Sequence, residues 1–260
     1  MRHTFTAMTY NLWGGWDLDS RSPALTALLE LRAPDLLGVQ ELHPDSRDIV
    51  DAALPHHRRV NDEAPGWTKH SNLWWDTNVF DYLTHGFIDV GIRSEAAGLF
   101  WVQLRSKLLP ETPPLTFATA HLTWPGHPDE VETDRSPRTD QARNIATALD
   151  ELAGDRPILF TADMNDHARP MWAMYDGGFR EPFGALGRTC PPTHPVTPRF
   201  DRVARWEGVQ TVEKALDWIF FRGPVTPHNA EVIEYFHQGI APSDHKPVMA
   251  TFQLSHPTTH

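Results

Sequence analysis

The chain has 260 residues, 40% of them hydrophobic, and a formal net charge of −11. This length and apolar content suffice for a full core, and we expect one domain over residues 1–254 followed by a short tail over residues 255–260. The negative net charge argues against a protein that binds nucleic acid through a broad basic surface. The single cysteine excludes an intramolecular disulfide and a multi-cysteine zinc site. Because neither a secretory signal nor an apolar run of membrane-spanning length is visible, we expect a cytoplasmic protein without a membrane span.

The first forty residues predict a strand, a helix and a second strand. Residues Phe5–Leu12 alternate apolar and polar side chains as a strand does, and two glycines follow soon after. Ser22 and Pro23, followed by leucines at helical spacing, predict a helix that ends near Arg32. Residues 36–41 then form an apolar strand closed by an acid, so a parallel crossover is expected.

The middle of the chain predicts mostly strands. Residues Leu73–Phe80 and Phe87–Gly91 are expected to pair with each other, and Leu99–Leu104 and Leu115–Leu122 to form two more strands joined by a proline-rich turn. Residues His56–Arg59 form a compact basic cluster, which we expect to be a solvated surface turn.

The second half alternates long loops with regular elements. A charged loop rich in proline and glycine is expected over Thr123–Thr139, followed by a helix over Arg138–Leu152. The short apolar run Ile158–Phe160 predicts a buried strand that leads to Asp163. Residues 169–208 are expected to be largely irregular apart from a helix near 170–176, with strands over 216–221 and 247–252.

Eight polar residues flank or interrupt the apolar strands: Asn11, Glu41, His121, Asp163, Asn165, Asp217, Asp244 and His245. If the strands share one edge of the fold, these side chains converge on one cleft. Crowded ionised carboxylates repel each other and are costly to bury unless a cation or a histidine lies among them. Oxygen ligands with few imidazoles favour Mg²⁺ or Mn²⁺ over zinc. Taken singly, such residues are more often turn or cap residues, or satisfied histidines.

Six short blocks carry a family resemblance. In chain order they are Thr9–Trp13, Val39–Glu41, Thr119–Leu122, Thr161–Asn165, Leu216–Phe220 and Ser243–Val248. In order and spacing they resemble the signature blocks of the endonuclease/exonuclease/phosphatase superfamily, which includes pancreatic-type deoxyribonucleases, abasic-site endonucleases, neutral sphingomyelinases and inositol polyphosphate 5-phosphatases. The resemblance implies a four-layer α/β sandwich, in which two mixed β-sheets pack face to face between helices and the site lies at one end.

The resemblance also implies a metal site and a histidine beside it. Glu41 would be the main ligand of Mg²⁺ or Mn²⁺, helped by Asn11 and Asp244. His245 would act as a general base or would polarise a phosphate, with Asp244 fixing its tautomer. In-line attack on a phosphoester needs an oriented water, neutralisation of charge on the non-bridging oxygens and help for the departing alkoxide.

The remaining residues are implied to complete the site. Asp163 and Asn165 would position the attacking water and hold a phosphate oxygen. His121 would hydrogen-bond another phosphate oxygen or protonate the leaving group, and Asp217 would support these groups. Whether Asp163 or His245 activates the water stays open.

Two positions depart from the superfamily pattern. Ala162 stands where glycine is more usual before the aspartate, and Lys69, His70 and Ser71 stand where some nucleases place an acid that holds the catalytic histidine. The second departure puts a carboxylate-assisted His121 in doubt, and with it the role of His121 as a general acid.

Charge and aromatic content bear on the substrate. The cleft of a duplex-cleaving nuclease would be flanked by clusters of Arg and Lys, and this sequence has few. Trp13, Trp16 and Trp124 follow the catalytic strand ends, where they could wall a pocket around a small phosphoester. We therefore favour a small-molecule or nucleotide phosphoester as substrate, with a metal-dependent nuclease that acts on nucleic acid as the alternative. A catalytically silent binding protein is the alternative of another class, and the sequence sets no oligomeric state.

Overall fold

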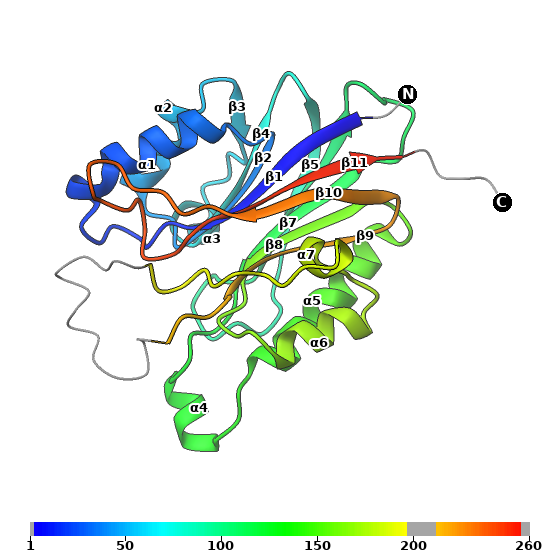
Figure 1. Cartoon of the computed structure of the whole chain (residues 1–260). Helices are drawn as coiled ribbons and strands as arrows, with labels where there is room; N and C mark the ends of the chain where they lie inside the picture. The colour runs from blue at the N-terminus through cyan, green and yellow to red at the C-terminus, as the bar shows by residue number, and fades with distance from the viewer. Residues whose placement is uncertain (1–2, 197–211, 256–260) are drawn as a thin grey trace.

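The computed structural model describes residues 3–196 and 212–255 (Figure 1). All but the first residue of the expected C-terminal tail, and residues 197–208 of the stretch expected to be irregular, therefore lie outside the described residues. The strands are β1 (His3–Asn11), β2 (Leu36–Gln40), β3 (His57–Arg59), β4 (Ser71–Asp76), β5 (Phe80–Ile88), β6 (Leu99–Ser106), β7 (Leu115–His121), β8 (Ile158–Asp163), β9 (Asp217–Arg222), β10 (Val225–Val232) and β11 (Val248–Leu254). The helices are α1 (Leu18–Arg32), α2 (Pro44–Ala53), α3 (Pro65–Lys69), α4 (Pro128–Thr133), α5 (Arg138–Ala153), α6 (Arg169–Asp176) and α7 (Pro182–Ala185).

Within the described residues the strands form two mixed sheets. The first has the order β10-β11-β1-β2-β4-β3, and the second has the order β5-β6-β7-β8-β9. Each sheet contains one parallel pair, β1 with β2 and β7 with β8, and each pair is joined by a helical crossover as the sequence predicts. The other pairings are antiparallel.

The expected four-layer sandwich is confirmed. Figure 1 shows α1 and α2 on the outer side of the first sheet and α5 and α6 on the outer side of the second. Strand β1 shows why its sequence alternates: Phe5 and Ala7 belong to the core between the sheets, whereas Met8 and Tyr10 pack with the leucines of α1. Each fully buried large side chain stabilises the fold by roughly 1.5–3 kcal/mol.

The expected pairing of the strands near residues 73–80 and 87–91 is wrong. Strand β4 begins earlier, at Ser71, and pairs with β2 and β3 in the first sheet, whereas β5 pairs with β6 in the second. The chain changes sheets in the turn between Asp76 and Phe80, where the side chain of Asp76 accepts hydrogen bonds from Asn78. The expected surface turn over His56–Arg59 is also wrong in part, because His57–Arg59 forms the edge strand β3.

Helix α1 begins one turn earlier than the sequence predicts. It starts at Leu18, so Pro23 lies inside the helix rather than at its first position. Proline cannot donate to the carbonyl oxygen of Asp19, four residues before it, and this oxygen instead accepts from the Ser22 hydroxyl at 3.3 Å. The side chain of Ser22 therefore compensates for the missing donor. None of the described helices combines the length and the apolar character that crossing a membrane requires.

Candidate active site

The two parallel strand pairs end at the same edge of the sandwich. Asn11 and Asp163 are the last residues of β1 and β8, and the amide of Asn11 donates to Asp163 Oδ2 at 2.9 Å across the gap between the sheets. Glu41 follows β2 directly, and His121 ends β7 as the register partner of Asp163. Asp217 opens β9 opposite Asp163. The fold thus brings five predicted site residues to one place.

Asp163 lies at the centre of this site. Its carboxylate is fully buried and accepts hydrogen bonds from Asn11 Nδ2 at 2.9 Å and from the backbone N–H of Asn165 at 2.8 Å. His121 Nε2 and His245 Nε2 lie 3.4 and 3.8 Å from Asp163 Oδ2. Burial alone would raise the pKa of Asp163, but the two histidines and these hydrogen bonds outweigh burial and lower it. Asp163 is therefore an ionised acceptor in a pocket of donors.

Asn165 reaches the site through a turn rather than along a strand. Strand β8 ends at Asp163, and Asn165 has a left-handed backbone with φ 49°. Its side-chain amide lies 2.9 Å from His121 Nε2 and donates to the carbonyl of Leu122 at 2.9 Å. Asp163 and Asn165 therefore meet the same group of side chains, and Asn165 reaches it because the chain turns after β8.

Three residues at this edge hold backbones that L side chains rarely adopt. Trp13, Glu41 and Asn165 have φ values of 56°, 50° and 49°. Asparagine tolerates this region, whereas tryptophan and glutamate adopt it at a cost of about 1–3 kcal/mol each. Such strain persists only where the surroundings dictate the conformation, and it is concentrated at functional sites. The strain is thus a second signal, independent of residue type, that marks the ends of β1, β2 and β8.

His245 is held by Asp217 and not by Asp244. Its Nδ1 lies 2.8 Å from Asp217 Oδ2, and both side chains are buried. The expectation that Asp244 fixes the tautomer is therefore corrected: the carboxylate hydrogen-bonded to His245 Nδ1 comes from Asp217 on β9. Burial alone would lower the pKa of His245, but Asp217 and Asp163 raise it well above its usual value. His245 therefore keeps its proton at neutral pH.

A strap over residues 193–196, which the sequence analysis does not predict, connects the segments that carry Asp217 and His245. Thr193 Oγ1 accepts from the backbone N–H groups of Leu216 and Asp217 at 2.9 and 3.2 Å, and the Thr193 carbonyl accepts from Lys246 N at 2.7 Å. The strap therefore fixes the start of β9 against the loop that carries His245.

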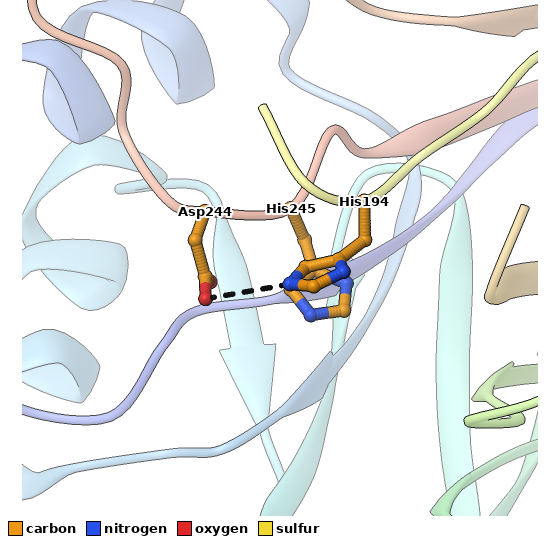
Figure 2. A group of neighbouring side chains, drawn as sticks. All are labelled: His194, Asp244 and His245. Atoms are coloured by element: carbon orange, nitrogen blue, oxygen red, sulfur yellow. Dashed lines mark ion pairs between the residues drawn. The ribbon is translucent and has the colours of Figure 1, made fainter. Parts of the chain in front are cut away.

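His194 of this strap is a residue that sequence reasoning missed. Its ring lies against the ring of His245 (Figure 2); the ring centroids are 4.5 Å apart, and His194 Nε2 lies 3.8 Å from Asp244 Oδ2. Burial and the neighbouring His245 lower the pKa of His194 to about 3, so the imidazole is neutral. Two imidazoles and one carboxylate suit a borderline metal better than a hard one. His194 pairs with Lys214 in an isolated β-bridge and not in a strand. No alternating pattern or strand end therefore marks His194 in the sequence.

Asp244 lies buried in the loop before β11. Its Oδ1 accepts a hydrogen bond from the Ser243 hydroxyl at 3.3 Å, and the same hydroxyl lies 2.8 Å from the carbonyl of Asn11. Burial, with a further contribution from the charge of Glu41, raises the pKa of Asp244 to about 7. A cation near Asp244 and Glu41 would stabilise the ionised form of Asp244 and lower its pKa.

Arg21 of α1 ties together two loops that carry the site. Its side chain is 1% exposed and donates to the carbonyls of Trp16 and Pro242 at 2.7 Å each, of Gly14 at 2.8 Å and of Trp13 at 3.2 Å. The first loop follows Asn11, and the second precedes Asp244 and His245. One guanidinium thus bridges segments that lie 221 residues apart in the sequence.

Replacement of Arg21 by Met should lower the free energy of unfolding by about 3 kcal/mol, because four carbonyls lose charged donors and stay partly buried. Urea unfolding followed by circular dichroism measures this loss. The matched Arg143→Met variant, whose side chain is 63% exposed on α5, should change stability by less than about 0.5 kcal/mol. Equal stability of the two variants would show that Arg21 does not act as a tie.

Glu41, His121 and Asp163 fit a hard divalent cation. They offer one ligand atom each, and these atoms all lie within 4.8 Å of one another. Two of the three are carboxylates, the ligand type that Mg²⁺ and Mn²⁺ prefer. Asn11 lies between the carboxylates but turns its nitrogen toward them, since its Oδ1 accepts from the backbone of Trp13 at 2.9 Å. A ligand role for Asn11 would therefore require its amide to turn over.

Just before β4, where some nucleases place an acid that holds the catalytic histidine, the described chain carries Lys69 and His70. His70 occupies this neighbourhood, where burial and the charge of His121 lower the pKa of His70. His121 is instead hydrogen-bonded to the amide of Asn165. Carboxylates do lie beside His121, but from other elements: Asp163 Oδ2 and Glu41 Oε1 are 3.4 and 3.9 Å from its Nε2.

The loop after β7 follows His121 directly and contains the short helix α4, which the sequence did not predict. Trp124, three residues after His121, is 53% exposed, and Trp16 on the loop after β1 is 72% exposed. Arg138 holds α4 against α5 through a two-pronged pair with Glu130, at 2.7 and 2.9 Å. This pair fixes the loop that presents Trp124.

The Glu130–Arg138 pair should give the loop a pH-dependent stability. The Arg138 guanidinium lowers the pKa of Glu130 below its ordinary 4.5, so the stabilisation is complete above pH 4.5 and is lost as the pH falls through the lower, folded-state pKa. We expect Glu130→Gln to cost about 1–2 kcal/mol at pH 7 and much less near pH 3. Urea unfolding of both proteins at the two pH values measures this difference. A cost that is the same at both pH values would contradict the role of the ionised pair.

The comparisons with known proteins agree with this geometry. The model of the endonuclease/exonuclease/phosphatase family matches residues 8–245, and no curated protein matches the sequence. Among solved structures, D. rerio TDP2 complexed with single strand DNA product is 20% identical, with a TM-score of 0.76 over 96% of this chain and 98% of that chain. A Bacteroides thetaiotaomicron mannosyl-6-phosphatase is 17% identical, with a TM-score of 0.71 over 95% of this chain and 99% of that chain.

A third solved structure, an endonuclease/exonuclease/phosphatase from Bacteroides vulgatus, is 16% identical, with a TM-score of 0.76 over 97% of this chain and all of that chain. At these identities the structural likenesses establish the fold. The family match spans most of the chain and includes every candidate site residue. The chain therefore belongs to the endonuclease/exonuclease/phosphatase family, a superfamily of metal-dependent phosphoesterases.

Proposed function

We propose that this protein is a Mg²⁺- or Mn²⁺-dependent hydrolase of small-molecule or nucleotide phosphoesters. The observation that carries the proposal is the environment of Asp163: an ionised, buried carboxylate that accepts from two asparagines and lies between two histidines, next to Glu41. In-line hydrolysis needs an oriented water, positive charge beside the phosphate and help for the leaving oxygen. This edge of the fold supplies a residue for each need.

Asp163 and His245 divide two of these roles. Asp163 is held ionised, so it can accept a proton from the attacking water, with Asn11 and Asn165 fixing its orientation. His245 keeps its proton because Asp217 lies 2.8 Å from its Nδ1. Its Nε2–H can therefore donate to a non-bridging phosphate oxygen as negative charge develops. This division favours Asp163 over His245 as the base, a choice that the sequence left open.

Glu41, with Asp163 and His121, would hold the divalent cation, which when bound would neutralise charge on the phosphate and activate its phosphorus toward attack. Asn165 directs its amide at His121 Nε2 and thereby orients the imidazole toward the same pocket. A hydrogen bond from His121 to a phosphate oxygen or the leaving group is the alternative to its ligand role, because one ring nitrogen cannot serve both.

The charged side chains on and beside the loop after β7 favour a small substrate. Arg138 contacts both Glu130 and Asp166, at 2.7 and 3.5 Å, and Arg93 lies 3.5 Å from Asp129. These arginines are therefore already neutralised by carboxylates and offer little to a duplex backbone. The exposed Trp16 and Trp124 offer flat apolar faces instead. The same faces could stack unpaired bases, which keeps single-stranded nucleic acid as the second candidate.

Hydrolysis of bis(p-nitrophenyl) phosphate, and of a panel of nucleotides and sugar phosphates, tests the proposal. We expect turnover with Mg²⁺ or Mn²⁺, none with EDTA, and faster turnover of a small ester than of plasmid or single-stranded DNA. Strong plasmid nicking at moderate salt would favour the nuclease alternative. No metal-dependent turnover of any phosphoester would favour a catalytically silent binding protein.

A further inference from the structure

A cavity of about 740 Å³ lies far from the candidate active site, where the outer strands of the two sheets approach each other. Strands β3 and β5 end the two sheet orders, and residues of both line it. We call it the edge cavity and define it by Arg58, Val60, Trp75, Phe80, Tyr82 and Lys107. Its volume is within the range of small-ligand sites.

The edge cavity is separate from the hydrolytic site. Trp75 pairs with Leu36 at the start of β2, whereas Glu41 follows the other end of this strand. Five residues of extended chain separate Leu36 and Glu41 by roughly 16 Å. A ligand in the edge cavity would therefore not contact Asp163 or His245.

The floor of the edge cavity is apolar and aromatic. Val60, Trp75 and Phe80 are buried members of the core between the sheets. The ring of Tyr82 stacks on Trp75 with centroids 5.6 Å apart and planes at 18°, and Tyr82 is still 45% exposed. The Tyr82 hydroxyl lies 2.7 Å from His85 Nδ1, and His85 Nε2 lies 3.3 Å from Asp62. Tyr82 is thus a fixed, accessible ring on which a second planar group can stack.

The rim carries three basic side chains, Arg58, Arg59 and Lys107, and one acid, Asp81. Lys107 pairs with Asp81 at 3.3 Å, and Arg59 pairs with Asp51 at 3.1 Å. Arg58 is exposed, and its guanidinium makes no hydrogen bond or ion pair that the described residues record. Its five donors suit the oxygens of a phosphate. The basic cluster of the sequence thus stands beside an aromatic floor.

We propose that the edge cavity is a second, noncatalytic binding site for a mononucleotide-sized phosphate ester that carries a planar ring. The ring stacks on Tyr82, and the phosphate lies on Arg58. The competing explanation is that Arg58 only keeps the edge strand β3 from pairing with other chains. The two explanations differ in whether the cavity binds such a ligand at all.

Calorimetric titration of the full chain with adenosine 5′-monophosphate tests the proposal. EDTA is present throughout, so the hydrolytic site lacks its cation, and failure here leaves the proposed function untouched. We expect Arg58→Glu to weaken binding at least about tenfold, which is at least about 1.4 kcal/mol. The matched Arg143→Glu variant, on the exposed face of α5, should bind within about twofold of the unchanged protein.

Two further titrations separate the contributions of the ring and the phosphate. Tyr82→Ala should weaken binding of the nucleotide but leave binding of inorganic phosphate unchanged, and adenosine should bind at least about tenfold more weakly than its monophosphate. Thermal unfolding checks that Arg58→Glu and Tyr82→Ala remain folded. Absence of nucleotide binding up to about 5 mM, or equal binding by Arg58→Glu and Arg143→Glu, overturns the proposal.

Discussion

The Asp217→Asn variant is expected to lose about a hundredfold to ten-thousandfold in kcat for a small phosphoester while remaining folded. Asp217 Oδ2 lies 2.8 Å from His245 Nδ1 and, with Asp163, keeps His245 protonated. Asparagine has nearly the same shape but carries no charge, so the pKa of His245 falls and its Nε2–H is no longer available to the phosphate over as wide a pH range. The steady-state rate as a function of pH, measured with saturating Mg²⁺, reports both the loss in kcat and the lowered pKa of His245.

A matched control distinguishes the loss of a carboxylate at the site from the loss of a carboxylate elsewhere on the protein. Asp150→Asn removes a carboxylate that is 64% exposed and pairs with Arg222 on the outer helix layer. This variant should keep the kcat of the unchanged protein within about twofold. If Asp217→Asn were equally active, Asp217 would have no part in the reaction. If Asp217→Asn lost activity without a change in the pH profile, its role would be structural and not electrostatic.

The Glu41→Gln variant is expected to bind Mn²⁺ at least about a hundredfold more weakly and to lose most of its turnover. Glu41 is the most accessible carboxylate of the group that fits a cation, with a side chain that is 35% exposed, and a neutral amide is a poorer ligand. Its second expected effect follows from charge: without Glu41 one cause of the raised pKa of Asp244 disappears. Calorimetric titration with Mn²⁺ and initial rates over a range of Mg²⁺ concentrations measure both losses.

Glu151→Gln is the control for Glu41→Gln, because Glu151 is an exposed acid of α5. It should leave the Mn²⁺ affinity unchanged. Full Mn²⁺ affinity in Glu41→Gln would place the cation elsewhere, and the group of His194, Asp244 and His245 is the next arrangement to test.

Much of the fold was predictable because apolar runs and their ends have a direct physical meaning. The runs at β1, β2, β7, β8, β9 and β11 are buried strands, and polar residues at the ends of β1 and β8 stand at the candidate site. The mistake at β4 and β5 has a clear cause. The period of two that marks a strand does not tell which neighbour it pairs with, and here the chain crosses from one sheet to the other within a short turn.

The site was predictable in its residue types but not in its contacts. All eight predicted residues lie at one edge, yet the partner of His245 is Asp217, which comes from a different strand 28 residues away. Sequence spacing cannot show such a contact. Arg21 stands just before the helix that the sequence predicts, where nothing marks its four carbonyl partners, and His194 stands in a segment without periodicity. Both depend on contacts between segments far apart in the sequence, which local sequence patterns do not predict.

The most direct test of the account is the Mg²⁺-dependent hydrolysis of bis(p-nitrophenyl) phosphate by Asp163→Asn. We expect a loss of at least about a hundredfold in kcat, because the amide keeps the shape of Asp163 but can no longer take a proton from water. Mn²⁺ titration and urea unfolding of the same variant show whether cation binding and the fold survive. Turnover equal to that of the unchanged protein would contradict the assignment of Asp163 as the centre of the site.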